Sequence, residues 1–372
     1  MPTKFKLTPQ INRVGKEYIV PLSEEQEARA MDLHENSIVF DLHMHGVVYP
    51  EDVEDINAWM KTLRYEMGYA GIKRAGLTAF IDGVASMAHT WSLEDAVREL
   101  GLRGCDLDHN YDKVIRATRA EDVYRAKKEG KTAIFTCIEN AEPVGNDLDN
   151  LDLLYGMGVR AMGLCYNKRS LVGDGRTERT DSGLSNFGLR YIERMNDLGM
   201  IVDAAHAGVR TTIEAAEASQ DPIIISHTGA AAVHNTGRMA RDEELVAVTS
   251  KGGLIGIHSG PNVLSDATRQ GVEDMIDHLD YCVDLVGIDH VAIGSDNYFG
   301  DKNAVHAHTI REHAADGLQN YLSFAAPYME GIENPSEWPN ITRELVRRGY
   351  SDEVIQKLIS GNTLRLIEQV IG

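Results

Sequence analysis

Cysteine is scarce in this sequence, and its few thiols are not arranged to bind a metal. The four cysteines among 372 residues are Cys105, Cys137, Cys165 and Cys282, and no two of them form a C-x-x-C pair. We therefore expect no cysteine zinc site and no disulfide framework. A chain of this length can bury a core large enough to fold without such cross-links. The low thiol count is typical of a reducing compartment, which predicts a cytoplasmic protein.

Basic residues and long apolar runs are also in short supply. Lys and Arg total 37 against 57 Asp and Glu, so the formal net charge is −20. A chain with this balance repels polyphosphates and anionic lipid surfaces, so we expect neither nucleic acid nor a membrane as a partner. No apolar run approaches the roughly 18 residues of a spanning helix. Residues 1–20 also lack the apolar core of a signal peptide.

Short apolar runs alternate with helix-like stretches along most of the chain. Stretches such as Asn186–Leu198 and Asp242–Ser250 have helical patterns. Short apolar strands separated by helices indicate a parallel sheet that is buried on both faces, and eight such units favour a closed (β/α)8 TIM barrel of the α/β class. The eight predicted strands are Ser37–Asp41, Leu77–Ile81, Thr132–Ile138, Ala161–Leu164, Ile201–Asp203, Ile223–Ser226, Leu254–Ile257 and Val291–Ile293.

The sequence predicts one domain over residues 1–372. No internal repeat, low-complexity tract or linker rich in Pro, Gly or Ser interrupts it. Residues 1–36 precede the first predicted strand and are expected to form a helical extension. Ser23 is a suitable N-cap for that helix, with Glu25 and Glu27 in its first turn.

Polar residues with metal-binding side chains follow five of the predicted strands. In a (β/α)8 barrel the carboxyl ends of all strands meet at one face, so these side chains should converge. Residues i and i+2 of an extended segment point to the same side, so the first pair can hold one ion together. A lone histidine at a strand end is more often a cap or a core residue, but the whole set predicts a metal centre. Its ligands suit zinc, and also manganese, iron or cobalt. The predicted ligands are His43, His45, Glu139, His206, His227 and Asp296.

Three long stretches of the sequence are specific enough to identify a family: GLSNFGLRYIERMNDLGMIVDAAHAG, DPIIISHTGAAAVHNTGRMARDEEL and GIDHVAIGSD. With these stretches the chain resembles, from about residue 30 to the C-terminus, the membrane (renal) dipeptidase family of the amidohydrolase superfamily. The resemblance implies a barrel hydrolase with two zinc ions bridged by a glutamate, and a homodimer. It also implies that Arg238 binds a substrate carboxylate and that Asp296 accepts a proton from the bridging water. The implied ligands of one ion are His43, Glu139 and Asp296 with His45 beside them, and those of the other are Glu139, His206 and His227.

Three departures from the family pattern fall in the implied site. His45 stands where the family has an aspartate, Tyr166 replaces a substrate-contacting histidine, and Asn297–Phe299 lengthens the segment after Asp296. A neutral histidine in place of an aspartate raises the charge of the ligand set, which should promote deprotonation of the bridging water and favour an anionic substrate. Tyr166 can still donate a hydrogen bond to an oxyanion, but it stays neutral near pH 7. Together these changes predict weak dipeptidase activity and a different small substrate that bears a carboxylate.

Simpler interpretations exist for the supporting residues. Arg238 could instead be a surface ion-pair partner of Asp242 or Glu243, and Tyr166 could pack across the barrel mouth. Asp203 is either a partner of a ligand or a structural residue at a strand end. The remaining histidines that we considered are predicted not to be ligands; they are His234, His258, His290, His306 and His308.

The leading functional hypothesis is hydrolysis of an amide bond by two divalent metal ions, with Zn²⁺ as the expected metal. The substrate would be a dipeptide, an N-acyl amino acid or a small lactam. A non-hydrolytic enzyme on the same scaffold, such as a tautomerase or lyase, is the alternative that loss of the family histidine and aspartate would fit. A metal-binding protein without catalysis is weaker, because metal, base and oxyanion-donor groups are all predicted.

Overall fold

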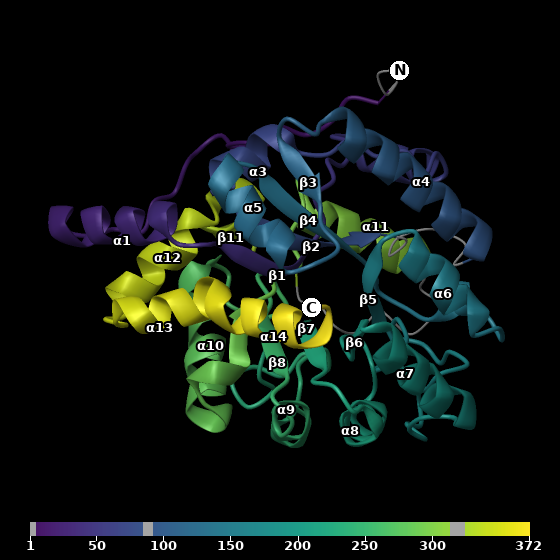
Figure 1. Ribbon diagram of the computed structural model, residues 1–372. Coiled ribbons are helices and arrows are strands. Elements are labelled where there is room, and N and C mark those ends of the chain that lie inside the picture. Colours follow the sequence, from purple (N-terminus) through teal and green to yellow (C-terminus); the bar gives the residue numbers. More distant parts are fainter. Residues whose placement is uncertain (1–4, 85–91, 313–323) are drawn as a thin grey trace.

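Eight parallel strands form a nearly closed barrel in the computed structural model, which describes residues 5–84, 92–312 and 324–372 (Figure 1). Each strand pairs in parallel with the next in the order β1-β2-β4-β5-β6-β7-β8-β10. A further short strand, β3 (Val114–Arg116), lies beside the first residues of β4. The barrel strands are β1 Phe40–Met44, β2 Ala79–Val84, β4 Thr132–Ile138, β5 Val159–Gly163, β6 Ile201–Asp203, β7 Ile224–Thr228, β8 Leu254–Ile257 and β10 Val291–Ile293.

Helices surround the barrel on the outside, as Figure 1 shows. A small ladder of β9 (Gln270–Gly271) and β11 (Met329–Glu330) lies apart from the main sheet. The helices are α1 Glu24–Asn36, α2 Ile56–Met60, α3 Tyr69–Ala75, α4 Leu93–His109, α5 Glu121–Glu129, α6 Asp149–Gly156, α7 Asn186–Leu198, α8 Val209–Ala218, α9 Asp242–Thr249, α10 Val272–Val286, α11 Lys302–Glu312, α12 Pro339–Arg347, α13 Asp352–Gln356 and α14 Asn362–Val370.

The predicted elements are present, with shifts at several ends. β4, β6, β8, β10 and α7 have the predicted bounds, and the predicted α9 ends one residue earlier. The prediction of Ser37–Asp41 for the first strand was wrong at both ends, because pairing with β2 begins at Phe40 and continues to Met44. The structure therefore places His43 inside a strand. The predicted β2, β5 and β7 are displaced by one to three residues at their ends, and β3 was not predicted. Strand bounds depend on the neighbouring strand, which local composition does not reveal.

The barrel core follows from the alternation of side chains along each strand. One buried cluster takes residues from all eight barrel strands, among them Phe40 of β1 and Phe135 of β4, whose rings stack with centroids 5.9 Å apart. Their sequence neighbours, such as Ile134, belong to a second cluster that packs against the helices. Because both faces of the strands are buried, the strands are apolar along most of their length.

The barrel closes between β1 and β10 through contacts just beyond the strand ends. The Asp296 N–H donates to the His43 carbonyl at 2.8 Å, and the His45 N–H donates to the Asn297 carbonyl at 2.8 Å. The Asp41 carboxylate accepts from the backbone N–H of Ser295 at 3.0 Å. These bonds hold the segment after β10 against the end of β1. The seam therefore sets Asp296 beside the two histidines of the first strand.

The N-terminal segment carries the predicted capped helix. The Ser23 hydroxyl accepts from the Gln26 N–H, and the Gln26 side chain accepts from the Ser23 N–H. Glu25 and Glu27 lie in the first turn of α1, as predicted, where their negative charges interact favourably with the positive end of the helix dipole. The α1 helix packs on α12, and the Arg343 guanidinium binds Glu27 there.

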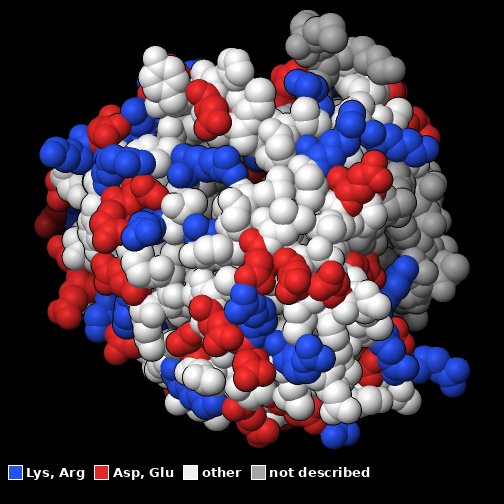
Figure 2. Space-filling view, turned by 45° about the vertical axis from the view of Figure 1, so that its right-hand side comes forward, with Lys and Arg blue, Asp and Glu red and all other residues white. Residues whose placement is uncertain are grey.

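The acidic excess does not gather into one patch on the face displayed in Figure 2. Acidic and basic side chains are interspersed over that face.

Among the helices of residues 5–84, 92–312 and 324–372, none combines the length and apolar character needed to traverse a bilayer.

Gly163 is the last residue of β5, and its lack of a side chain leaves room for the backbone of Glu139, which directly follows β4. A Cβ atom at position 163 would lie 2.0 Å from the Glu139 carbonyl oxygen, so one of the two backbones would have to move. We predict that Gly163→Ala lowers the free energy of unfolding by about 1–3 kcal/mol, the cost of overpacking a filled core. Urea unfolding measures this difference.

The matched control is Gly101→Ala in α4, where an added Cβ meets nothing within 4 Å. Alanine is favoured over glycine inside helices by roughly 0.5–1 kcal/mol, so this variant should be as stable as the parent or slightly more stable. Equal stability of the two variants would contradict the close approach of Gly163 to Glu139.

Candidate metal centre and active site

All six predicted ligands lie together at the carboxyl ends of the barrel strands. His43 lies in β1 and His227 in β7. His45 and Glu139 directly follow their strands, and His206 and Asp296 lie in the turns just beyond β6 and β10. Five of the six are at most 7% exposed, and only Asp296 is partly open to solvent. The backbone at His206 and Asp296 has φ values of 65° and 50°. Non-glycine residues rarely adopt such angles, and each costs of order 1–3 kcal/mol. This strain turns both side chains toward the shared site.

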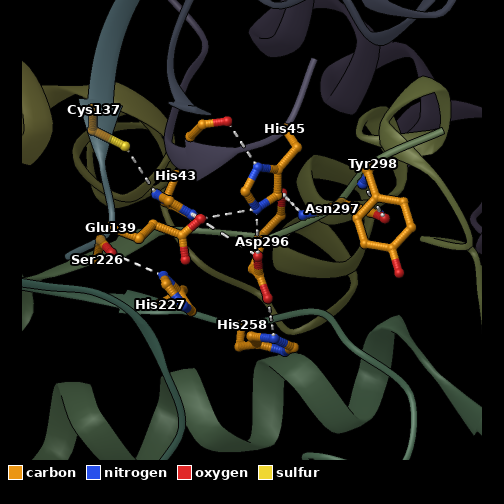
Figure 3. A network of polar contacts seen from close by, with 12 residues as sticks. His43, His45, Cys137, Glu139, Ser226, His227, His258, Asp296, Asn297 and Tyr298 are labelled. Carbon is orange, nitrogen blue, oxygen red and sulfur yellow. Dashed lines mark hydrogen bonds and ion pairs between the residues drawn. The ribbon is translucent and has the colours of Figure 1, made fainter. Parts of the chain in front are cut away.

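Glu139 lies between two sets of histidines and offers one oxygen to each. Its Oε1 is 3.7 Å from His43 Nε2 and 3.4 Å from His45 Nε2 (Figure 3). Its Oε2 is 3.6 Å from His206 Nε2. On the second side, His206 Nε2 and His227 Nε2 are 2.9 Å apart. This arrangement is what a carboxylate needs to bridge two ions.

Two atoms at the centre of the site fit a metal better than any protein partner. His43 Nε2 and Glu139 Oε1 are buried and have no hydrogen-bond partner among the residues that the structure describes. Buried polar atoms are rarely left unpaired, because the lost solvation costs about 1–3 kcal/mol each. Coordination to a divalent ion satisfies both atoms at once. Two groups of residues could each hold an ion, because the ligand atoms within each group all lie within 4.8 Å of one another. One group is His43, Glu139 and His227, and the other is His43, His45 and Asp296.

The first of these sets differs from the set implied by the family resemblance, which pairs His227 with His206. The His43 and His227 rings stack with centroids 4.4 Å apart, so His227 borders both halves of the site. His206 and His227, the pair implied by the family resemblance, are also close in space, since their Nε2 atoms lie 2.9 Å apart. Two nitrogen ligands of one tetrahedral zinc lie about 3.3 Å apart, given Zn–N bonds of about 2.0–2.1 Å. Either set can therefore hold an ion.

Each ligand histidine is oriented by a contact at its other ring nitrogen, which leaves Nε2 facing the centre. Such outer contacts select the tautomer of a metal-binding imidazole. Sequence reasoning did not find these partners, because each depends on the packing of a different strand end. The Nδ1 contacts are His43 with Cys137 Sγ at 3.6 Å, His45 with the Gly83 carbonyl at 3.0 Å, His206 with Asn167 Oδ1 at 2.9 Å and His227 with Ser226 Oγ at 2.8 Å.

The two sides of the site differ in electrostatics. Burial lowers the pKa of His206 to about 4, which leaves a neutral imidazole near pH 7. Burial also acts to lower the pKa of His45, but the charges of Glu139 and Asp296 outweigh it and raise that pKa to about 9. Without a metal, His45 therefore carries a proton between two carboxylates. A metal ion at this position must displace that proton, so its affinity should fall at low pH.

The supporting residues lie at the edge of the site and are partly exposed. The Tyr166 ring stacks on the His206 ring with centroids 4.0 Å apart, so it packs at the mouth beside a candidate ligand. Arg238 donates to the His227 carbonyl at 3.3 Å. In the described part of the chain no ion pair joins Arg238 to Asp242 or Glu243, so the interpretation of Arg238 as their surface partner was wrong.

Asp203 has the structural role of a strand-end residue. One carboxylate oxygen accepts from the backbone N–H groups of Ala205 at 2.9 Å and Ser226 at 3.0 Å. These bonds shape the turn that leads to His206 and tie it to β7. The other role considered for Asp203 was to contact the imidazole of His206, and Asn167 makes that contact instead.

The lengthened segment after Asp296 forms a wall of the site. Asn297 donates to the Ile332 carbonyl at 3.0 Å, which anchors the segment to the chain after β11. The centroid of the Tyr298 ring lies 6.3 Å from that of the His45 ring (Figure 3). It lies 4.4 Å from the centroid of the Tyr49 ring. An aromatic cluster thus borders the histidine that departs from the family pattern.

His258 is a further site residue that sequence reasoning did not place at the metal centre. It was predicted not to be a ligand, and its Nε2 lies 2.8 Å from Asp296 Oδ2, the carboxylate of a candidate ligand (Figure 3). The signal for its position was present, since His258 directly follows β8 just as Glu139 follows β4. By contrast, His290 lies before β10 at the other end of the barrel and contacts the Gly253 carbonyl.

Comparison with known proteins agrees with the resemblance in the sequence. The chain is 27% identical over 285 residues to Dipeptidase tcpJ of Claviceps purpurea (strain 20.1), and 26% identical over 281 residues to Dipeptidase verJ of Clonostachys rogersoniana. These matches cover 76% and 75% of this chain, but only 61% and 66% of the two relatives' own lengths. The crystal structure of an amidohydrolase from Pseudomonas aeruginosa, 27% identical, superposes with a TM-score of 0.78 over 92% of this chain and 98% of that one.

The family match spans the barrel and the site. The membrane dipeptidase family matches residues 27–307 and 320–371, which include every barrel strand and each candidate ligand. The structure brings these ligands into one cluster at the carboxyl face, where the barrel fold places its active sites. The chain therefore belongs to the membrane dipeptidase family, peptidase family M19.

Proposed function

We propose that this protein is a hydrolase that uses two divalent metal ions to cleave an amide bond in a small substrate bearing a carboxylate. The observation that carries the proposal is the position of Glu139, whose two oxygens face different histidine sets. A single-metal site would not need a buried glutamate that is shared in this way. The unpartnered atoms of His43 and Glu139 support it.

The proposed ligands divide the site into two halves that share Glu139. The set of imidazole and carboxylate ligands suits Zn²⁺, which we propose as the metal. Divalent ions held by these residues would supply Lewis-acid chemistry, polarising a scissile carbonyl and lowering the pKa of an attacking water. One half comprises His43, His45 and Asp296, and the other comprises His206 and His227.

The residues around the metal centre have separate tasks in this proposal. Asp296 takes a proton from the attacking water and passes it to the leaving nitrogen. Arg238, which borders His227, holds the substrate carboxylate with its planar guanidinium. Tyr166, which covers His206, donates a hydrogen bond to the oxyanion of the tetrahedral intermediate. Arg238 and Tyr166 each border a candidate ligand, whereas Asp296 is a candidate ligand itself.

The candidate substrates are the three classes proposed from the sequence: a dipeptide, an N-acyl amino acid or a lactam. The two relatives named dipeptidases support a dipeptide. The departures at His45, Tyr166 and Asn297–Phe299 favour another substrate, because all of them border the same centre. We propose that dipeptide cleavage is a minor activity.

Substitution of the shared glutamate tests the metal centre. Glu139→Gln removes the charge that serves both halves, so we expect at most one tightly bound zinc per chain in place of two. Turnover of any substrate should fall at least about a hundredfold, because a site that holds a single ion lacks the contribution of the second ion to catalysis. Metal content after zinc loading and gel filtration, measured by mass spectrometry, gives the stoichiometry.

Glu142→Gln is the matched control, because Glu142 is the next acidic residue along the chain and is exposed. It should retain two zinc ions and full turnover. A Glu139→Gln protein that still binds two zinc ions tightly would overturn the proposed bridging role.

Exchange of Tyr166 tests the substrate proposal. A well-placed oxyanion donor is worth about a hundredfold or more in rate, and tyrosine directs its hydroxyl differently from an imidazole. We expect kcat/KM of the parent on dipeptides to lie below about 10⁴ M⁻¹s⁻¹, the low end of the usual enzyme range. Tyr166→His should raise it by about tenfold or more.

The control variant Tyr166→Phe keeps the stack on His206 but lacks the hydroxyl. It should lower kcat on the best substrate found among dipeptides of both chiralities, N-acyl amino acids and lactams. A parent enzyme that cleaves dipeptides with kcat/KM near 10⁶ M⁻¹s⁻¹, well inside the usual enzyme range, would show that this chain is a dipeptidase despite its departures.

A further inference from the structure

We propose that His258 is a positioning residue for Asp296: its Nε2–H holds one carboxylate oxygen so that the other faces the metal centre. His258 is not itself a ligand in this proposal. The inference rests on the proposed function only in that Asp296 serves a metal centre. It adds a residue to the site that neither the ligand pattern nor the resemblance assigns.

The contact between the two side chains is short and buried. His258 Nε2 lies 2.8 Å from Asp296 Oδ2, and His258 is 3% exposed. The other oxygen, Oδ1, lies 3.2 Å from His45 Nε2 and 3.9 Å from His43 Nε2. Figure 3 shows the carboxylate between His45 on one side and His258 on the other. The two oxygens of Asp296 therefore have different surroundings.

The tautomer of His258 is determined by its second ring nitrogen. The Gly260 N–H donates to His258 Nδ1 at 2.6 Å, so Nδ1 is an acceptor and carries no proton. The other ring nitrogen, Nε2, faces the Asp296 carboxylate and carries the proton of the ring. This Nε2–H donates to Asp296 Oδ2. A nitrogen that donates to a carboxylate has no lone pair available for a metal ion.

Glycine at position 260 makes this arrangement possible. A Cβ atom there would lie 2.1 Å from His258 Cε1, so a larger residue could not approach the ring this closely. The bond to Gly260 also keeps Nδ1 occupied. Because Nε2 already carries the proton of the ring, it has no lone pair with which to accept a proton from Asp296. The geometry thus favours a fixed donor over a proton carrier.

Asp296 needs such a support because its own backbone does not fix the carboxylate. The backbone is held by the bond from its N–H to the His43 carbonyl, at a strained φ of 50°. The side chain still lies at the open mouth, 19% exposed, where its terminal torsion is broad. A donor on Oδ2 restricts this rotation and keeps Oδ1 toward the ligand histidines. Partners of this kind typically contribute 10–100-fold to metal affinity or activity.

The test measures metal affinity directly, on apo-protein titrated with Co²⁺ or Zn²⁺ against a competing chelator. In His258→Phe the ring remains and the donor is lost, so we expect one of the two sites to weaken by about 10–100-fold. In His258→Gln an amide N–H can still donate, and affinity should stay within about threefold of the parent. The control His290→Phe removes a histidine at the opposite end of the barrel and should change neither site.

Turnover gives a second readout, in which His258→Phe should lower kcat more than it changes KM. Because the titration needs no substrate, it decides the inference even if no hydrolase activity is found. If the phenylalanine variant does not fold, as judged by circular dichroism, His258→Met takes its place as a variant without a donor. Unchanged affinity in the variant without a donor would overturn the proposal. Loss of a whole metal equivalent in both that variant and His258→Gln would also overturn it, because His258 would then be a ligand.

Discussion

The candidate site depends on the seam where the first and last strands of the barrel meet. Backbone bonds from Asp296 to His43 and from His45 to Asn297 join residues about 250 positions apart in the sequence. Without this seam, Asp296 and the first histidine pair would have no reason to share an ion. The same bonds hold Asp296 in a strained backbone conformation, which is tolerated because the surrounding barrel determines it. The same backbone bonds therefore close the barrel and hold Asp296 beside the first histidine pair.

Charge balance explains why so many titratable groups can be buried at one place. Glu139 lies between histidines whose pKa values move in opposite directions, with His45 raised to about 9 and His206 lowered to about 4. A protonated His45 compensates the carboxylates when no metal is bound, whereas the neutral His206 is ready to coordinate. Divalent ions would replace the proton by a larger charge and satisfy the unpartnered atoms of His43 and Glu139. The site is therefore polar and buried, and its groups fit a bound cation.

The residues that we interpret as departures from the family pattern border the site on different sides, although they are scattered along the sequence. Tyr166 covers His206, while Tyr298 lies beside His45 on the other side. His258 contributes a further contact through Asp296. Changes that surround one centre from different strands alter the shape and charge offered to a substrate, but they leave the candidate ligands in place. This is the physical basis for proposing a conserved type of chemistry with a changed substrate.

The sequence by itself determined the barrel class and indicated the types of the candidate ligands. Apolar runs separated by helical patterns sufficed for eight strands, and β4, β6, β8 and β10 matched to the residue, because a strand buried on both faces is apolar along its length. Strand ends then indicated where His43, Glu139 and Asp296 should converge. The sequence could not show that the first strand runs to Met44, that Arg238 contacts His227, or that His258 donates to Asp296. Those facts depend on strand register, on closure of the barrel and on the tautomer imposed by Gly260, and only the tertiary structure decides them, because each involves groups that are distant in sequence or a backbone contact that no residue type specifies.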